Sequence, residues 1–87
     1  FIGTSIKNSF FEDTNLDNVI FDSADLSGTK FIRSSLIGTN FQNSNLMGAN
    51  FTNSNMINAT FEGANLIGAT WTDGETCGSN SIGECKK

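Results

Sequence analysis

Large apolar residues recur at every fifth position over most of this 87-residue chain. They occupy fifteen consecutive sites of this register: Phe1, Ile6, Phe11, Leu16, Phe21, Leu26, Phe31, Leu36, Phe41, Leu46, Phe51, Met56, Phe61, Leu66 and Trp71. A period of five fits neither the 3.6-residue period of an α-helix nor the two-residue period of a flat strand. The chain is therefore predicted to turn once in every five-residue repeat.

The positions around each large apolar residue are also regular. Two residues before it stands Ala, Ser or Thr, with Val19 as the exception, which indicates a second inward position with little room. The residue immediately before it is often Asn or Asp, at Asn15, Asp25, Asn40, Asn45, Asn50, Asn55 and Asn65. Two residues after it, Gly or Asn dominates, and both tolerate a positive φ. The predicted corners are therefore Asn8, Asn18, Gly28, Gly38, Asn43, Gly48, Asn53, Asn58, Gly63 and Gly68.

This repeat, as in Ala64-Asn65-Leu66-Ile67-Gly68, resembles that of the pentapeptide-repeat proteins over residues 1 to about 72. The resemblance implies an all-β fold, a right-handed quadrilateral β-helix with twenty residues in each coil. We expect residues 1–72 to form about 3.5 coils of this solenoid. Residues 73–87 are expected to form a Cys-containing C-terminal capping tail.

Residues twenty apart are then expected to lie above one another in the core. Two aromatic columns should occupy opposite faces, one of Phe21, Phe41 and Phe61, the other of Phe11, Phe31, Phe51 and Trp71. The columns between them are Leu26, Leu46 and Leu66, and Leu16, Leu36 and Met56. Each fully buried side chain of this core stack should contribute about 1.5–3 kcal/mol.

The register fails after Trp71, because Thr76 stands where a large apolar residue is expected. The Gly- and Ser-rich segment that follows contains the two cysteines, Cys77 and Cys85. We favour a disulfide between them, which would anchor the tail and contribute about 2–3 kcal/mol by loop entropy. Two free thiols are an alternative, and a metal site is another, although the chain has no His to complete a zinc site.

A disulfide would indicate an oxidising compartment: periplasm, thylakoid lumen or extracellular space. The stretch from Trp71 to Cys85 also resembles the tails of exported pentapeptide-repeat proteins of bacteria, cyanobacteria included. The chain begins at Phe1 without Met, so we expect a processed or trimmed product whose export signal has been removed. No apolar run is long enough to span a bilayer.

Six outward positions carry large apolar residues and form the candidate contact surface. Phe10 and Ile20 stand where Asn or Asp is expected, so the first coil is a candidate for a cap, for end-to-end contact with a second molecule, or for neither. The other four form two short ladders, Ile37 with Ile57 and Met47 with Ile67. These residues also favour β structure for packing reasons alone, so the ladders do not by themselves require a function.

Catalysis has little support in the sequence, which lacks His, a nucleophile motif and a phosphate-binding loop. We therefore expect no enzyme activity, cofactor or metal. A net charge of −4 with five Lys and Arg disfavours direct binding of nucleic acid. Acidic residues cluster at Glu12, Asp13, Asp17, Asp22 and Asp25, and Asp13 is expected to pair with Arg33 one coil above it.

Two functions follow from these observations. The first is a non-catalytic structural or protein-interaction solenoid whose partner is another protein. The alternative is a DNA-mimicking protein that binds a topoisomerase such as DNA gyrase, as some pentapeptide-repeat proteins do. Those proteins are longer, dimeric through a C-terminal element and strongly acidic along one face, whereas the middle of this chain is almost uncharged. Ice binding is disfavoured because the surface columns are mixed.

Overall fold

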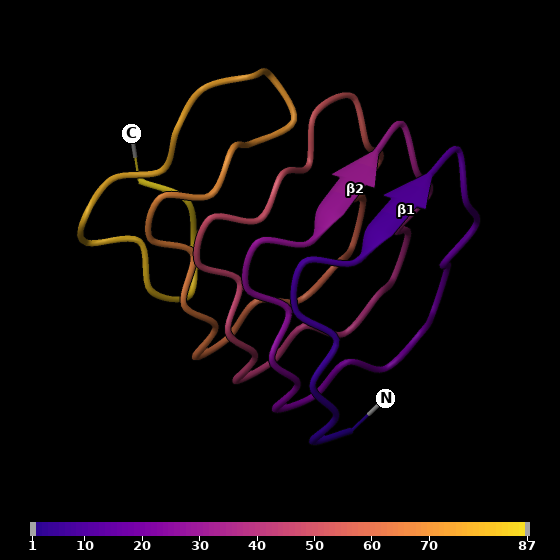
Figure 1. The fold of residues 1–87 in the computed structure, drawn as a ribbon, viewed down its shortest axis with the longest axis horizontal. Coiled ribbons are helices and arrows are strands. Elements are labelled where there is room, and N and C mark those ends of the chain that lie inside the picture. Colours follow the sequence, from indigo (N-terminus) through magenta and orange to yellow (C-terminus); the bar gives the residue numbers. More distant parts are fainter. Residues whose placement is uncertain (1, 87) are drawn as a thin grey trace.

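The structure is a computed structural model that describes residues 2–86, and the chain winds as successive stacked turns (Figure 1). Strand β1, Phe10–Glu12, pairs in parallel with strand β2, Lys30–Ile32. The pairing joins residues twenty apart, so that Phe11 lies opposite Phe31. Further parallel bridges with the same spacing continue as far as Asn50 and Thr70. Residues 2–86 contain no helix, and the molecule is a β-helical solenoid.

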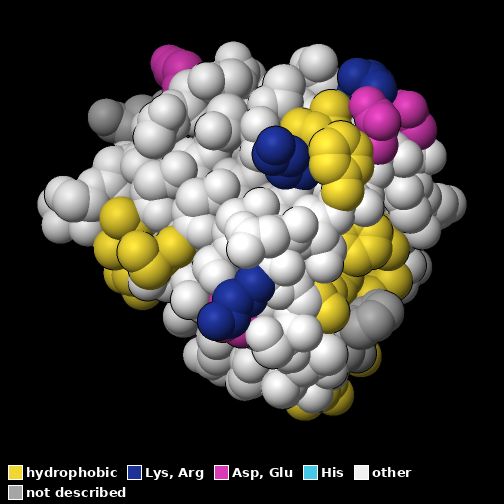
Figure 2. Space-filling model, viewed as in Figure 1, with side chains coloured by type: hydrophobic (Ala, Val, Ile, Leu, Met, Phe, Trp, Pro, Cys, Tyr) yellow, Lys and Arg dark blue, Asp and Glu magenta, His cyan; other side chains and the backbone are white. Residues whose placement is uncertain are grey.

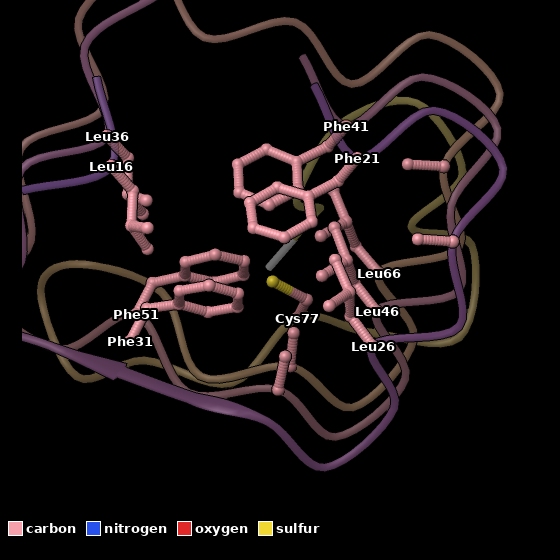
Figure 3. Packing of buried hydrophobic residues seen from close by; sticks show 14 residues of the cluster. Leu16, Phe21, Leu26, Phe31, Leu36, Phe41, Leu46, Phe51, Leu66 and Cys77 are labelled. Carbon is pink, nitrogen blue, oxygen red and sulfur yellow. The ribbon is translucent and has the colours of Figure 1, made fainter. Parts of the chain in front are cut away.

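Four walls of side chains enclose the core, as expected from the four pentapeptides of each coil (Figure 3). Two of these walls are columns of Phe, and the walls between them are columns of Leu. Eight residues of the core stack have no exposed surface: Phe21, Leu26, Phe31, Leu36, Phe41, Leu46, Phe51 and Leu66. Phe11, Met56, Phe61 and Trp71 are only partly buried because they lie near the two ends of the solenoid. Phe1, which begins the register, lies outside the described residues.

The Phe columns are ordered in two directions. Within a column the rings stack almost in parallel, with centroids 5.4 Å apart for Phe21 and Phe41. Between the columns the rings meet edge to face, at 5.7 Å for Phe31 and Phe41. Trp71 continues its predicted column, with its ring centroid 5.5 Å from that of Phe51, but the two ring planes lie at 66° to each other. Trp71 is in the last repeat, where no further ring fixes its orientation.

The predicted corners are confirmed, since all ten predicted Gly and Asn residues have a positive φ. Gly3, Asp13, Ser23 and Arg33 occupy the same register and also have a positive φ. At most corners an N–H donates to a carbonyl three residues earlier, as Ala24 does to Phe21 at 3.0 Å. This combination is typical of a type II turn, whose third residue requires a positive φ.

The structure also explains the Asn and Asp residues that precede the apolar centres. Their side-chain oxygens accept the N–H two residues later, as Asn45 does from Met47 at 3.1 Å. This Asx-type bond satisfies an outward N–H at each corner. The seven residues that make it are Asn15, Asp25, Asn40, Asn45, Asn50, Asn55 and Asn65. They are the same seven that the repeat pattern identified.

Small hydroxyl side chains connect successive coils from inside. The Thr39 hydroxyl donates to the carbonyl of Leu16 at 2.8 Å, and the Ser34 hydroxyl donates to that of Phe11 at 2.8 Å. Both side chains are buried. Within residues 2–86, no buried side-chain nitrogen or oxygen lacks a hydrogen-bond partner. The small polar residues are therefore compatible with a closely packed core.

Gly48→Ala should lower the free energy of unfolding by about 1–2 kcal/mol, because an L-residue is strained at its φ of 68°. A Cβ at this position would meet no atom within 4 Å, so the backbone alone determines the cost. Gly38 has a φ of 70°, and its Cβ would lie 2.4 Å from Oδ1 of Asn18. Gly38→Ala should therefore cost more than Gly48→Ala in urea unfolding, and equal losses would show that the Asn18 side chain moves aside freely.

Candidate functional site

Four residues of the candidate contact surface are well exposed. Phe10 and Ile20 expose 58% and 48% of their surface on the first coil. Ile57 exposes 60% and Met47 exposes 43%, each on a different face of the solenoid. None of the four belongs to the buried core, so the packing of the core does not require an apolar side chain at these positions. Their role in binding stays a prediction.

The two apolar ladders are shorter than the sequence predicted, because Ile37 and Ile67 are only partly exposed. Ile37 lies between Asp17 and Ile57 in its column, and the N–H of Ile37 donates to the Asp17 carboxylate at 3.0 Å. Beside Ile67, Gly68 is hydrogen-bonded to Cys77 of the tail at 3.0 Å. Neighbouring coils and the tail therefore cover part of both side chains.

Two other apolar residues, Ile2 and Ile82, are exposed at 69% and 52% and were not identified from the sequence. Ile2 stands immediately after the start of the chain, in a register that elsewhere holds polar and apolar residues alike. Ile82 lies in the tail, where the five-residue register no longer assigns an orientation. Its pairing with Asn65 depends on where the tail runs over the solenoid.

The tail runs antiparallel to the last repeats and is closed by a disulfide between Cys77 and Cys85. Leu66 donates to the carbonyl of Ser81 at 2.8 Å, and the N–H of Gly83 donates to Ala64 at 2.8 Å. Cys77 is 2% exposed and belongs to the core cluster, where Figure 3 shows its sulfur close to the aromatic and Leu columns. The disulfide therefore lies against the core.

The tail leaves part of the C-terminal end uncovered. We use the term open rim for the backbone of residues 54–63, which forms two sides of this end and finishes at Gly63, where Gly83 of the tail lies alongside. A shallow depression of about 480 Å³ lies beside the open rim, at the corner where the tail turns away. Phe61 and Ile82 contribute apolar surface to it, and Glu62 and Glu84 contribute carboxylates. Both Glu side chains are exposed.

Charged side chains gather near the loops that follow β1 and β2 (Figure 2). The predicted contact of Arg33 with Asp13 is present at 3.0 Å, and Arg33 also contacts Glu12 at 2.5 Å. The hydrogen bond from Arg33 lowers the pKa of Asp13, and those carboxylates raise the pKa of Arg33. Hydrogen bonds from Ser27 lower the pKa of Asp25, which also lies 3.8 Å from Lys7. These ion pairs interrupt the acidic cluster, so they do not favour mimicry of DNA.

Arg33→Gln should reduce stability near neutral pH and have a smaller effect at a pH well below 3.8, the ordinary pKa of Asp. The lowered pKa of Asp13 stabilises the fold above its ordinary value of 3.8, and this contribution is lost as the pH falls through the folded value. Urea midpoints of both proteins at the two pH values test this expectation. Lys30→Gln is the control, because Lys30 forms no ion pair with another described residue. A difference from wild type that is equally large at the lower pH would indicate that strain or packing at Arg33 matters more than its charge.

Metal and membrane sites have no structural counterpart in the part of the chain that the structure describes. Residues 2–86 contain no group of three or more His, Cys, Asp or Glu side chains placed to hold a metal ion. The same residues form no helix long and apolar enough to cross a membrane. The remaining candidate binding surfaces are the outward apolar residues, the tail and the open rim.

Comparisons with known proteins agree with this architecture. Residues 4–85 match the family model described as a pentapeptide repeat region. The structure is similar to that of HetL, a pentapeptide repeat protein involved in heterocyst differentiation regulation from the cyanobacterium Nostoc sp. strain PCC 7120. The TM-score is 0.80 at 25% sequence identity, over 83% of this chain and 34% of the HetL chain. This chain therefore corresponds to about a third of HetL. No curated protein matches it by sequence.

Proposed function

The chain belongs to the pentapeptide-repeat family, and from this premise we propose that it is a non-catalytic solenoid that binds another protein in an oxidising compartment. Members of this family form right-handed β-helices and in general act through protein contacts rather than catalysis. A solenoid presents a rigid outer surface on which side chains can vary without changing the core. The proposal concerns what this particular surface does.

The observation that carries the proposal is the exposure of large apolar residues that the fold does not need. Phe10, Ile20, Met47 and Ile57 are 43–60% exposed. Polar residues occupy the positions equivalent to Phe10 and Ile20 in the later coils, so the fold does not need an apolar side chain there. Aromatic residues and Met are enriched at contacts between proteins. The first coil, with Phe10 and Ile20, also fits an end-to-end contact between copies.

The Cys77–Cys85 disulfide supports the proposed compartment. Disulfides persist in the periplasm, in lumenal spaces and outside the cell, and are rare where thiol reductants are abundant. Trapping of thiols in the native cells, followed by intact mass with and without reduction, tests this part. A trapped disulfide is expected, whereas two alkylated cysteines would contradict the proposed location.

Capture of a partner tests the binding role. The folded chain carrying a photo-crosslinker next to Ile57 or Phe10 should crosslink one protein reproducibly in extracts of its own compartment. The Ile57→Ser and Phe10→Ser variants should lose that crosslink at their own sites, and Thr52→Ser is the control because its side chain is small and polar in both forms. The proposal would be wrong if no crosslink depended on these residues or on a folded chain.

A further inference from the structure

The backbone N–H and carbonyl groups of the open rim have counterparts twenty residues earlier, and those counterparts are hydrogen-bonded to the next coil. One coil earlier, Leu36 donates to Asn55 at 2.8 Å and Gly38 donates to Ile57 at 2.9 Å. On the adjacent side, Phe41 donates to Thr60 and Asn43 donates to Glu62, both at 2.8 Å. The corresponding donors of the open rim are the N–H groups of Met56, Asn58, Phe61 and Gly63. Within residues 2–86 these four N–H groups have no hydrogen-bond acceptor.

The carbonyls of the open rim complete an edge for strand pairing. In the coil below, the carbonyl of Ser34 accepts from Asn55 at 3.0 Å and that of Thr39 accepts from Thr60 at 3.0 Å. Twenty residues later, the carbonyls of Ser54 and Ala59 accept no hydrogen bond from a described residue. The open rim therefore presents alternating donors and acceptors, as the edge of a β-sheet does.

The other half of the same end already binds an extended segment that is not part of the repeat. The tail pairs with it in antiparallel orientation, through Asn65 with Ile82 and Thr70 with Thr76. Gly68 donates to Cys77 at 3.0 Å, and Cys77 donates to Ala69 at 2.7 Å. The tail thus shows which kind of ligand fits this end of the solenoid, namely an extended polypeptide strand.

The depression beside the open rim favours one kind of side chain on a bound segment, namely Lys or Arg. Its apolar part, from Phe61 and Ile82, would cover the aliphatic stem of a Lys or Arg. Its carboxylates, Glu62 and Glu84, form no ion pair with a described residue. Among the described residues, no Lys or Arg lines the depression. An extended segment with a basic side chain at this corner would satisfy both the backbone edge and the carboxylates.

We infer that the open rim binds an extended, basic segment of a partner polypeptide by strand addition. The inference rests on the proposed function and identifies a binding mode and a partner chemistry for it. Main-chain hydrogen bonds to residues 54–63 would supply affinity, and the pocket for one Lys or Arg would supply specificity. A Lys or Arg stem would lie over Phe61, and its charged head would contact Glu62 and Glu84.

Amide hydrogen exchange of the folded chain, measured by NMR, tests the rim directly. Without ligand, the amides of Met56, Asn58, Phe61 and Gly63 should exchange much faster than those of the paired residues twenty positions earlier. The probe is the synthetic peptide Val-Thr-Val-Lys-Val-Thr-Val with blocked ends. At a free concentration ten times its Kd, it should slow exchange of the four rim amides about tenfold by mass action.

Three controls determine whether the binding mode is correct. The same peptide with Glu in place of Lys should bind more weakly, and an N-methylated form should not protect the rim amides. Glu62→Gln and Glu84→Gln should each weaken binding of the Lys peptide by about two- to fivefold, the range of exposed ion pairs. Asp22→Asn, which removes a carboxylate from the same column two coils below, should leave it unchanged.

Several outcomes would overturn the inference. Slow exchange at the four amides before peptide is added would show that the rim is already covered. Unchanged exchange with saturating peptide, or equal protection by the N-methylated form, would exclude strand addition. These failures would leave the proposed function intact if the crosslinks at Ile57 or Phe10 persist. Loss of those crosslinks, with the rim amides still protected by the peptide, would instead contradict the proposed function.

Discussion

Phe41→Ala should lower the free energy of unfolding by about 3–5 kcal/mol, the range for truncation of a fully buried aromatic ring. The Phe41 ring has no exposed surface and lies 5.4 Å from the ring of Phe21 and 5.2 Å from that of Phe61. It also meets Phe31 and Phe51 edge to face. Its removal would leave a cavity in the middle of the core. To close this cavity, the side chains of both Phe columns would have to move, because the Phe41 ring contacts both.

Chemical unfolding followed by circular dichroism measures this loss, and the chain provides a matched control. Phe10→Ala removes the same ring from a side chain that is 58% exposed, so it should change stability by about 0.5 kcal/mol or less. Phe41→Leu keeps most of the volume and loses the ring contacts, so we expect a loss between those of the two alanine variants. Similar losses for Phe41→Ala and Phe10→Ala would contradict the assignment of Phe41 to the core.

Replacement of both cysteines, as Cys77→Ser with Cys85→Ser, should destabilise the tail by about 2–3 kcal/mol through the loop entropy of an eight-residue separation. Since each part of a solenoid contacts only its neighbours, we expect the effect to remain local. Exchange of the Leu66 and Gly68 amides, which donate to the tail, should accelerate about 30- to 150-fold, the equivalent of that energy.

The same exchange experiment contains its control sites. The amides of Leu26 and Phe31, which donate to the next coil at 2.8 and 2.6 Å, should keep their protection. Ser79→Ala changes an exposed tail residue and should leave the Leu66 and Gly68 rates unaltered. Unchanged rates in the cysteine variant would show that hydrogen bonds alone hold the tail. Accelerated exchange throughout the chain would show that the disulfide stabilises the whole solenoid.

The repeated part of the fold was predictable because its chemistry is local and periodic. Each corner needs a residue that accepts a positive φ, and the Gly and Asn register identified ten of these positions correctly. It missed corners where the residue type gave no signal, such as Arg33 with a φ of 51°. The spacing of the Phe residues likewise predicted the stack of Phe21 with Phe41 and of Phe31 with Phe51.

The candidate site was less predictable because it depends on position along the stack rather than on residue type. Ile37 and Ile57 occupy the same register, yet Ile57 is exposed and Ile37 is partly covered. Ile82 received no assignment because the tail has no repeat. The open rim left no signal in the sequence, since residues 54–63 read like any other pair of repeats.

The sequence by itself determined the turn in every repeat, the twenty-residue spacing of stacked side chains and the presence of two nearby cysteines. Each of these properties depends on a few neighbouring residues, so it can be read from a single period. Only the tertiary structure decided where the tail runs, how Trp71 is oriented and which half of the C-terminal end stays unpaired. These features depend on hydrogen bonds between backbone groups of the repeats and of the tail, such as the bond from Gly83 to Ala64. The tail does not repeat, so the residue types near each group do not specify its partner.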